Sequence, residues 1–330
     1  MKILVTGGAG FIGSHLSKAL IERGDNVVII DNFNDFYDPK LKRDRISKFL
    51  KGCKFTLYEG DIRDYQFLET IFKKEKLDKV MHLAAVAGVR HSLIDPFVYE
   101  EVNVRGTLNL LELSVKYKIQ NFIFASSSSV YGLSKEAIFS EHHCVDFPIS
   151  MYAASKRAKE LMAHVYSHIH GLNTVGLRYF SVYGPWGRPD MALFKFTKNI
   201  LEDKPIDVYN YGKMSRSFTY IDDIVTGTLK AIDQNFKYEI INIGGAKEEQ
   251  LMRYIKLIEK YLGKKAKKNL MPMQPGDIHV SMADSRKLSK LDWNPKTSID
   301  EGIKHFINWY KNYYNVGDQE EAEAEQTASV

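Results

Sequence analysis

The chain has 330 residues, of which 44% are hydrophobic and 26% are charged, and its formal net charge is +5. This profile is typical of a two-domain globular protein with a sizeable core. It argues against a membrane protein, because no apolar run approaches the roughly 20 residues that cross a bilayer. The short apolar segment at residues 2–5 does not resemble a signal peptide. The two cysteines are expected to be free thiols, and we therefore expect a cytoplasmic protein.

Strand-like and helical segments alternate in the first half of the chain. Short runs rich in β-branched residues predict strands at residues 2–6, 26–30, 55–58, 79–81, 121–125 and 174–177. Helical spacing of apolar residues predicts helices at residues 11–23, 64–74, 96–117 and 151–170. This alternation predicts right-handed crossovers and a parallel sheet that is covered by helices on both faces.

The pattern changes after about residue 178. Residues 179–190 are rich in glycine, proline and aromatic residues, whereas residues 222–235, 248–262 and 298–313 have helical spacing. We therefore predict an α/β protein with a doubly wound parallel (Rossmann) sheet over residues 1–178. A smaller C-terminal α/β domain for the substrate is predicted over residues 179–316, with scope for a strand and a helix to return to the first domain. Residues 317–330 hold five acidic and no basic residues, and we expect an acidic disordered tail there.

A glycine-rich segment follows the first predicted strand and opens the first predicted helix. Gly7, Gly10 and Gly13 give the spacing G-x-x-G-x-x-G, which lets the backbone approach a pyrophosphate at a helix N-terminus. Asp31 ends the second strand, where a carboxylate can bind both ribose hydroxyls and repel a 2′-phosphate. The combination predicts NAD rather than NADP. A flavin-binding or nonredox Rossmann domain is the alternative.

Two later segments follow predicted strands of the same sheet. Asp61 and Ile62 come after the third strand, where they could contact adenine, and residues 83–85 come after the fourth, beside the pyrophosphate. Because ligands of such sheets bind outside the carboxyl ends of the strands, these positions extend the predicted dinucleotide site.

Tyr152 and Lys156 lie four residues apart on one predicted helix, and therefore on one helix face. A free tyrosine has a pKa of about 10, and a nearby ammonium group favours its phenolate form. Such a pair can remove a hydroxyl proton while hydride leaves the same carbon. A run of four serines, 126–129, follows the fifth strand and supplies a donor for the reacting oxygen.

The glycine segment, Asp31, Ser127, Tyr152 and Lys156 resemble the extended short-chain dehydrogenase/reductase family over about residues 1–316. Within that family, the segments 87–90, 184–192 and 218–223 are similar to the UDP-glucuronate 4-epimerases. The resemblance implies that Ser127, Tyr152 and Lys156 are catalytic. It implies the following dinucleotide contacts: Gly7, Gly10, Phe11, Ile12, Gly13, Asp31, Asn32, Asp61, Ile62, Leu83, Ala84, Ala85, Asn103, Tyr152, Lys156 and Tyr179.

The resemblance also implies a nucleotide-sugar site in the C-terminal half. The residues expected to bind the substrate are Arg90, Ser128, Ser129, Arg188, Tyr209, Arg216 and Asp277. Arg188 is the candidate for a uronate carboxylate, because a guanidinium can meet a carboxylate through two parallel hydrogen bonds. The alternative role of Arg188 is to brace its own loop.

Two positions depart from the pattern of the relatives. Ser217 stands where the family commonly has an aspartate after the arginine at 216, which puts the orientation of Arg216 in doubt. Gln274 stands where galactose-type epimerases often have arginine. Ser128 and Ser129 replace the carboxyl residues of family members that dehydrate or decarboxylate their sugars, which favours simple epimerisation at C4.

The sequence thus predicts an NAD-dependent isomerase that epimerises a UDP-sugar at C4, with UDP-glucuronate to UDP-galacturonate as the first candidate. A UDP-N-acetylglucosamine or UDP-glucose 4-epimerase is the alternative, and a non-catalytic NAD-sensing Rossmann protein is a more distant one. We expect no nucleic-acid or membrane partner and no metal site, since the adjacent side chains of residues 141–144 cannot easily face one ion. A homodimer is implied by the family resemblance alone.

Overall fold

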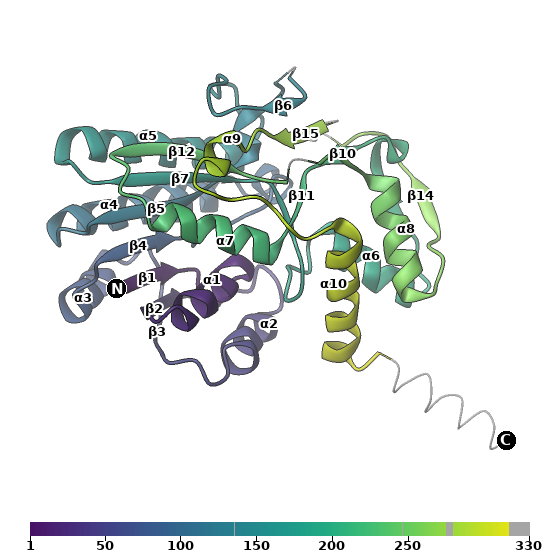
Figure 1. Cartoon of the computed structure of the whole chain (residues 1–330), viewed down its shortest axis with the longest axis horizontal. Helices are drawn as coiled ribbons and strands as arrows, with labels where there is room; N and C mark the ends of the chain where they lie inside the picture. Colours follow the sequence, from purple (N-terminus) through teal and green to yellow (C-terminus); the bar gives the residue numbers. More distant parts are fainter. Residues whose placement is uncertain (135, 246, 275–279, 317–330) are drawn as a thin grey trace.

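The computed structural model describes residues 1–134, 136–245, 247–274 and 280–316. Its centre is a seven-stranded sheet with the strand order β12-β7-β5-β4-β1-β2-β3, in which every neighbouring pair is parallel (Figure 1). The strands are β1 (Lys2–Thr6), β2 (Asn26–Asp31), β3 (Phe55–Glu59), β4 (Lys79–His82), β5 (Asn121–Ser127), β7 (Thr174–Tyr179) and β12 (Tyr238–Ile243). The predicted doubly wound parallel sheet is confirmed.

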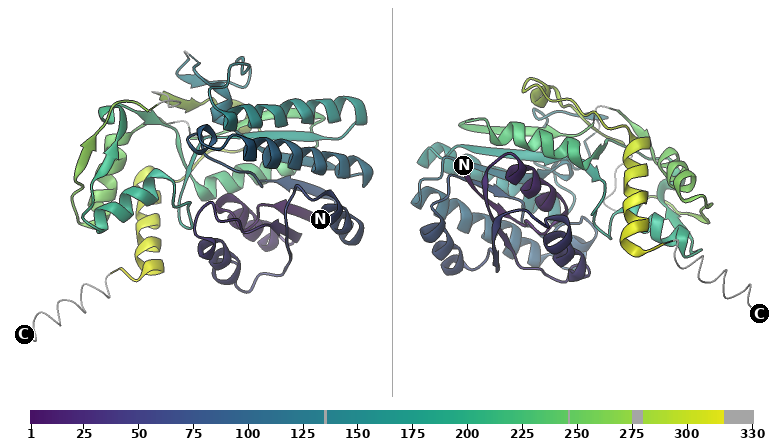
Figure 2. Two further views of the ribbon diagram at one scale, coloured as in Figure 1. Left: turned by 180° about the vertical axis from the view of Figure 1, so that it is seen from behind. Right: turned by 60° about the horizontal axis from the view of Figure 1, so that its bottom comes forward.

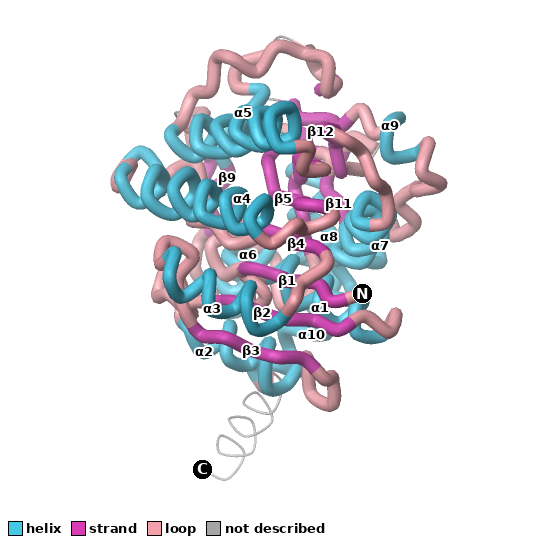
Figure 3. Tube along the Cα trace, turned by 90° about the vertical axis from the view of Figure 1, so that its left-hand side faces the viewer, coloured by secondary structure: helices cyan, strands magenta, loops and turns pink. Residues whose placement is uncertain are grey.

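Helices cover both faces of this sheet. On one face lie α3 (Tyr65–Glu75), α4 (Gly106–Lys116) and α5 (Met151–His170), and on the other lie α1 (Phe11–Glu22) and α7 (Ile221–Ile232) (Figure 3). Successive β1 side chains serve the two layers in turn, because side chains alternate along a strand. Ile3 and Val5 pack into the cluster that contains α1, and Leu4 packs into the cluster on the opposite face.

Helix α5 begins and ends at the residues that the sequence predicts. The Ser150 side chain caps its first turn by accepting a hydrogen bond from the Ala153 amide at 3.1 Å. Gly171 ends the helix at a φ of +67°, a left-handed conformation that favours glycine. These caps fix the helix that carries Tyr152 and Lys156.

The predicted helix over residues 96–117 differs from the observed structure. A π-helical segment, Tyr99–Arg105, precedes α4. At Gly106, where α4 begins, a Cβ atom would meet Ile62 Cδ1 at 2.5 Å. The absence of a side chain there lets the loop after β3 pack directly on the helix.

The remaining elements form a smaller region beside the carboxyl edge of the main sheet. Its helices are α6 (Ala192–Leu201), α8 (Leu251–Leu262) and α10 (Ile299–Tyr314), and α8 contacts both α6 and α10 (Figure 2). The short helix α9 (Arg286–Ser289) instead packs against β12 of the main sheet. The short strands of the smaller region form three sheets: β13-β10-β15-β6, β11-β8 and β14-β9. Their bounds are β6 (Ile138–Phe139), β8 (Ser181–Tyr183), β9 (Ile206–Val208), β10 (Ser215–Arg216), β11 (Phe218–Tyr220), β13 (Glu249–Gln250), β14 (Lys268–Leu270) and β15 (Val280–Ala283).

The chain crosses between the two regions more than once. Strand β12 and helix α7 come from the second half of the sequence, yet β12 pairs with β7 and α7 packs against α1. The boundary at residue 178 therefore marks a change in the sequence pattern. That it separates two independent domains stays a prediction. In the part of the chain that the structure describes, no helix has the length and apolar character that a bilayer crossing requires.

Candidate active site

A cavity of about 440 Å³ runs along the carboxyl ends of the parallel strands. Every predicted dinucleotide contact lines it except Asn103. Asn103 is buried behind the cavity, where its side chain bonds the backbone N–H and carbonyl of Val86 and the hydroxyl of Ser155. The fold thus brings together nearly the whole predicted cofactor site, and a direct contact from Asn103 stays a prediction.

The turn after β1 requires glycine for steric reasons. Gly7 has a φ of +70°, and a Cβ atom there would lie 2.8 Å from the Ala84 amide nitrogen. A Cβ atom on Gly13 would lie 2.1 Å from the Gly7 carbonyl oxygen. The close packing of this turn against the loop after β4 shapes one wall of the cavity, with the α1 N-terminus facing it. An anionic pyrophosphate fits such a wall.

Asp31 lies at the end of β2 and is buried. Its carboxylate accepts hydrogen bonds from the amides of Ala9, at 3.0 Å, and Phe33, at 2.9 Å. Burial raises the pKa of Asp31, and these hydrogen bonds and the charge of Lys42 oppose that rise. The carboxylate therefore sits in a site where a ribose diol could supply further donors.

Lys42 and Asn34 also line this cavity, and sequence reasoning did not find them. The Lys42 ammonium donates to the Asn34 carbonyl at 2.7 Å and to its side-chain oxygen at 2.8 Å. Lys42 lies on α2 (Pro39–Asp44), eleven residues after Asp31 in the sequence. No spacing rule locates it, because only the path of the intervening loop turns it toward the cavity.

The structure brings Tyr152, Lys156 and Ser127 together. Lys156 Nζ lies 5.6 Å from the centre of the Tyr152 ring and donates to the Ala125 carbonyl at 2.9 Å. Burial raises the pKa of Tyr152, whereas a hydrogen bond with Ser127 and the positive charge of Arg188 lower it. Burial, with a smaller contribution from Arg188, lowers the pKa of Lys156 to about 7. Lys156 is thus the member of the group whose pKa lies near neutral pH, whereas Tyr152 is protonated there.

The serine run spans the end of β5 and the turn that follows it, and it faces the same cavity. Ser127, Ser128 and Ser129 all line it, and the Ser127 hydroxyl donates to the Ser129 hydroxyl at 3.2 Å. Ser127 also caps the short helical turn Ser128–Tyr131 by accepting from the Ser129 amide. These contacts hold the hydroxyls at the carboxyl end of β5, beside the tyrosine.

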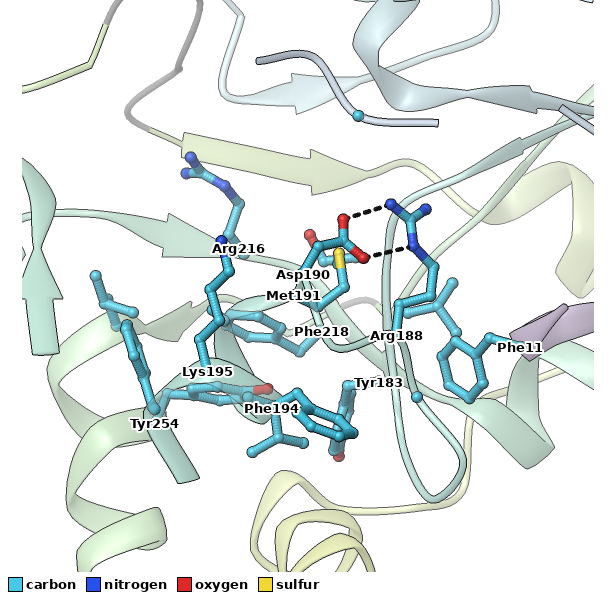
Figure 4. A pocket seen from close by; sticks show the side chains of 18 of the residues that line it. Phe11, Tyr183, Arg188, Asp190, Met191, Phe194, Lys195, Arg216, Phe218 and Tyr254 are labelled. Atoms are coloured by element: carbon cyan, nitrogen blue, oxygen red, sulfur yellow. Dashed lines mark hydrogen bonds and ion pairs between the residues drawn. The ribbon is translucent and has the colours of Figure 1, made fainter. Parts of the chain in front are cut away.

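A second cavity, of about 630 Å³, lies over the smaller region and adjoins the first. Four of the predicted substrate residues line it, namely Arg90, Arg188, Tyr209 and Arg216. Figure 4 shows Arg188 and Arg216 among the lining side chains. The Arg90 guanidinium lies 5.4 Å from the centre of the Tyr209 ring. The predicted contact of Asp277 falls outside the described residues. Arg188 borders both cavities.

Arg188 is bonded to Asp190, a partner that sequence reasoning did not assign. Nε donates to one carboxylate oxygen at 2.9 Å and Nη2 donates to the other at 2.5 Å (Figure 4). Within the described residues, Nη1 makes no hydrogen bond. The pair occupies one edge of the guanidinium, and the edge that contains Nη1 can meet a second carboxylate.

The serine at position 217 has a structural role. Its hydroxyl donates to the Gly245 carbonyl at 2.7 Å and accepts from the Ala283 amide at 3.2 Å. Arg216, at the end of β10, donates to the Ser215 carbonyl and lines the second cavity. The departure from the family pattern thus leaves Arg216 at the cavity wall.

The parallel sheet, the glycine-rich turn and the Tyr152–Lys156 pair define an extended short-chain dehydrogenase/reductase. A family model described as the NAD dependent epimerase/dehydratase family matches residues 3–244, and the chain belongs to that family.

Similar proteins cover nearly the whole chain. An uncharacterized protein of Methanocaldococcus jannaschii is 51% identical over 93% of this chain and 95% of its own length. The UDP-glucuronate 4-epimerase of Thermodesulfobacterium geofontis is 44% identical over 93% of this chain and 95% of its own. The crystal structure of UDP-glucuronic acid 4-epimerase from Bacillus cereus, in complex with UDP-glucuronic acid and NAD, has a TM-score of 0.90 and 39% identity. It covers 95% of this chain, which in turn covers all of that one.

Proposed function

We propose that the protein is an NAD-dependent 4-epimerase of UDP-sugars that interconverts UDP-glucuronate and UDP-galacturonate. The observation that carries the proposal is the meeting of the two cavities at Arg188, whose charge acts on Tyr152. A proton acceptor, a hydroxyl donor and a cation for a carboxylate therefore surround one place. The names of similar proteins support the same substrate.

In the proposed reaction, bound NAD accepts a hydride from C4 of the sugar and later returns it. Tyr152 takes the proton of the C4 hydroxyl. It returns the proton after the 4-keto sugar has rotated in the site and presented its opposite face to the cofactor. Ser127 holds the reacting oxygen by a hydrogen bond, and the Lys156 ammonium stabilises the phenolate. Since hydride and proton both return, the reaction inverts C4 without net oxidation.

A uronate places a further demand on the site. Its 4-keto intermediate is a β-keto acid, which loses carbon dioxide when the breaking bond aligns with the carbonyl π system. We propose that the carboxylate is bound by Arg188, Ser128 and Ser129. A carboxylate that is held near the carbonyl plane resists this decarboxylation. A closed site also strengthens the charge-assisted bond to Arg188.

A neutral substrate, UDP-glucose or UDP-N-acetylglucosamine, is the second candidate. The pairing of Arg188 with Asp190 favours it, because an arginine that already has a carboxylate partner can brace a loop. The third reading from the sequence, a binding protein without turnover, is disfavoured by the assembled Ser127, Tyr152 and Lys156.

Incubation with UDP-glucuronate, followed by chromatographic separation of the epimers, tests the proposal. We expect UDP-galacturonate to appear without added reductant and without release of NADH. UDP-glucose and UDP-N-acetylglucosamine run in parallel decide the substrate. Turnover of a neutral sugar alone would move the assignment to the second candidate, and no turnover of any sugar by NAD-loaded protein would support a binding role.

We further propose a homodimer built on α4 and α5. Four apolar side chains of these adjoining helices are exposed: Leu108, Leu161, Val165 and Ile169. On α5 they recur every four residues and form one stripe along the helix. The cytoplasmic location expected from the sequence stays a prediction.

A further inference from the structure

Arg45 is a completely buried arginine that neither the sequence nor the proposed reaction accounts for. It opens a π-helical turn, Arg45–Phe49, directly after α2. Nε donates to the Trp186 carbonyl at 3.0 Å, and Nη2 donates to the same carbonyl at 2.7 Å and to that of Gly187 at 3.1 Å. Nη1 donates to the Ala9 carbonyl at 3.0 Å and to the Tyr37 hydroxyl at 2.6 Å. A guanidinium has five N–H groups, and all five are used.

The three carbonyl partners belong to two loops of the candidate site, whereas Tyr37 lies in the segment before α2 and its hydroxyl helps to orient the guanidinium. Ala9 lies in the glycine-rich turn, and its amide also donates to Asp31. Trp186 and Gly187 directly precede Arg188 in the loop that separates the two cavities. Arg45 is therefore a bridge of hydrogen bonds between the predicted cofactor loop and the predicted substrate loop, which lie more than 170 residues apart in the sequence.

The bridge contains a buried positive charge, which acts on the Asp31 carboxylate without bonding to it. Within the described residues, Arg45 has no ion pair, and its partners are three backbone carbonyls and one hydroxyl. Removing a cation from water is costly, and dipoles compensate for it only when every donor is well placed. A methionine would avoid the cost of burying a charge, but it would leave the carbonyls of Ala9, Trp186 and Gly187 without these donors, so the arginine is explained by the carbonyls it bonds rather than by packing.

The loop that Arg45 holds has a backbone that needs external support. Trp186 has a φ of +59°, in the left-handed region that is unfavourable for a large side chain. Gly184 has a φ of +148°, and a Cβ atom on Gly187 would lie 2.9 Å from the Gly184 carbonyl oxygen. Conformations of this kind persist where the surroundings hold them. Three of the five Arg45 bonds are made to this loop.

We propose that Arg45 is a positioning residue for substrate selection: by tying residues 186 and 187 to the glycine-rich turn, it fixes Arg188 beside Tyr152 so that Arg188 can meet a carboxylate. The part that concerns the carboxylate rests on the proposed function. The tie between the two loops does not, because it follows from the hydrogen bonds alone.

The test compares Arg45→Lys with the matched control Arg43→Lys. Lysine keeps the charge but cannot reproduce a planar fork of five donors. Arg43 lies on the adjoining helix, is exposed and pairs with Glu59. In NAD-loaded enzyme, we expect the amides of Gly184, Trp186, Gly187 and Arg188 to exchange hydrogen at least tenfold faster in Arg45→Lys and at the wild-type rate in Arg43→Lys. Unchanged exchange in Arg45→Lys would overturn the proposal.

Kinetics then test the effect on substrate selection. For Arg45→Lys we expect kcat/KM for UDP-glucuronate to fall at least tenfold, while the inhibition constant of UDP-glucose changes less than threefold. In the double variant with Arg188→Ala, the two losses should not add, because both act through Arg188. Additive losses, or equal losses for both sugars, would show that Arg45 only stabilises the fold.

The proposed uronate substrate and the proposed role of Arg45 can fail independently of each other. If Arg188→Ala itself does not discriminate between the sugars, the proposed uronate substrate fails, and the exchange experiment still decides whether Arg45 holds the loop. If Arg45→Lys does not fold, Tyr37→Phe removes one acceptor of the bridge and should speed exchange in residues 184–188 by a smaller factor. A wild-type exchange rate in Tyr37→Phe would then reject the proposal.

Discussion

Tyr152 is the residue on which the proposed chemistry depends most directly. The sequence identifies it from its spacing to Lys156, but the electrostatics come from residues distant in sequence. Burial raises the pKa of Tyr152, and Ser127 and Arg188 oppose that rise. The tyrosine is therefore protonated in the free site, and a charged lysine and a cationic cofactor would be needed to make it a base.

Replacement of Tyr152 by phenylalanine should remove epimerisation and leave UDP-sugar binding largely intact. The lost group is the proton acceptor, and general acid–base catalysis typically contributes about 10²–10⁴-fold. Initial rates of epimer formation and calorimetric binding of UDP measure the two properties. Activity within threefold of the wild type would show that another group takes the proton.

Replacement of Arg188 by alanine should lower kcat/KM for UDP-glucuronate by about 10–100-fold, because a hydrogen bond to a charged group contributes on the order of 1.5–3 kcal/mol. Binding of UDP-glucose should weaken much less, and some UDP-pentose should form by decarboxylation. Kinetics on both sugars and mass analysis of the products check this. Equal losses would mean that Arg188 and Asp190 together only brace the loop.

The sequence predicts the contacts of individual residues less completely than it predicts helices and strands. The glycines, Asp31 and the candidate catalytic residues could be found because each has a fixed spacing from a strand or from a partner on one helix. Asp190 is only two residues from its partner Arg188, but no fixed spacing marks the pair. Lys42 and Arg45 act on groups that the fold brings near them. Their contacts depend on the paths of loops, which no local pattern encodes.

At the scale of elements, α1 both presents the cofactor loop and carries a buried histidine. His15 bonds the Phe11 carbonyl at 2.9 Å and lies against the rings of Phe11 and Phe49. Burial lowers the pKa of His15 to about 3. Below pH 6.5 the unfolded chain therefore binds a proton at this residue that the folded protein excludes. Buried His82, whose pKa is also lowered by burial, acts in the same direction.

Stability should therefore decrease as the pH falls from about 6.5 toward 3. One such histidine contributes a slope of about 1.4 kcal/mol per pH unit. The change His15→Gln removes this contribution, so the difference in unfolding free energy between variant and wild type should shift in favour of the variant as the pH falls. Urea unfolding at several pH values measures the slopes. Parallel curves for the two proteins would exclude His15 as a source of acid sensitivity.

The long elements could be predicted, and the short ones could not. Helix α5 has a capping serine, a terminal glycine and twenty residues of helical pattern, so local signals suffice. The strands of the smaller region have two to four residues. Strands of that length carry no periodicity, and their pairing depends on contacts between distant segments. The close approach of Ile62 to Gly106, at the start of α4, is likewise a contact between distant segments.

At the scale of the whole molecule, the exposed stripe on α5 predicts the assembly state. Light scattering during gel filtration should give about twice the 37.9 kDa of the chain. The change Leu161→Glu places a charge in the proposed interface and should shift the protein toward monomer. Leu270→Glu, at an exposed apolar position on β14, is the control and should not. A monomeric wild type, or a dimer insensitive to Leu161→Glu, would reject this interface.

The edge strand β12 has a consequence for how the protein is made. The sheet takes its last strand from residues 238–243, and the face of α1 that contacts α7 stays uncovered until α7 has been synthesised. A ribosome that adds about 5–20 residues per second needs roughly 3–13 s to extend the nascent chain from residue 178 to residue 243. During that interval β7 is an open edge, a template for pairing with other chains. We therefore expect a fragment that ends at residue 178 to aggregate when it is expressed alone, and a fragment that ends after β12 to remain in the supernatant.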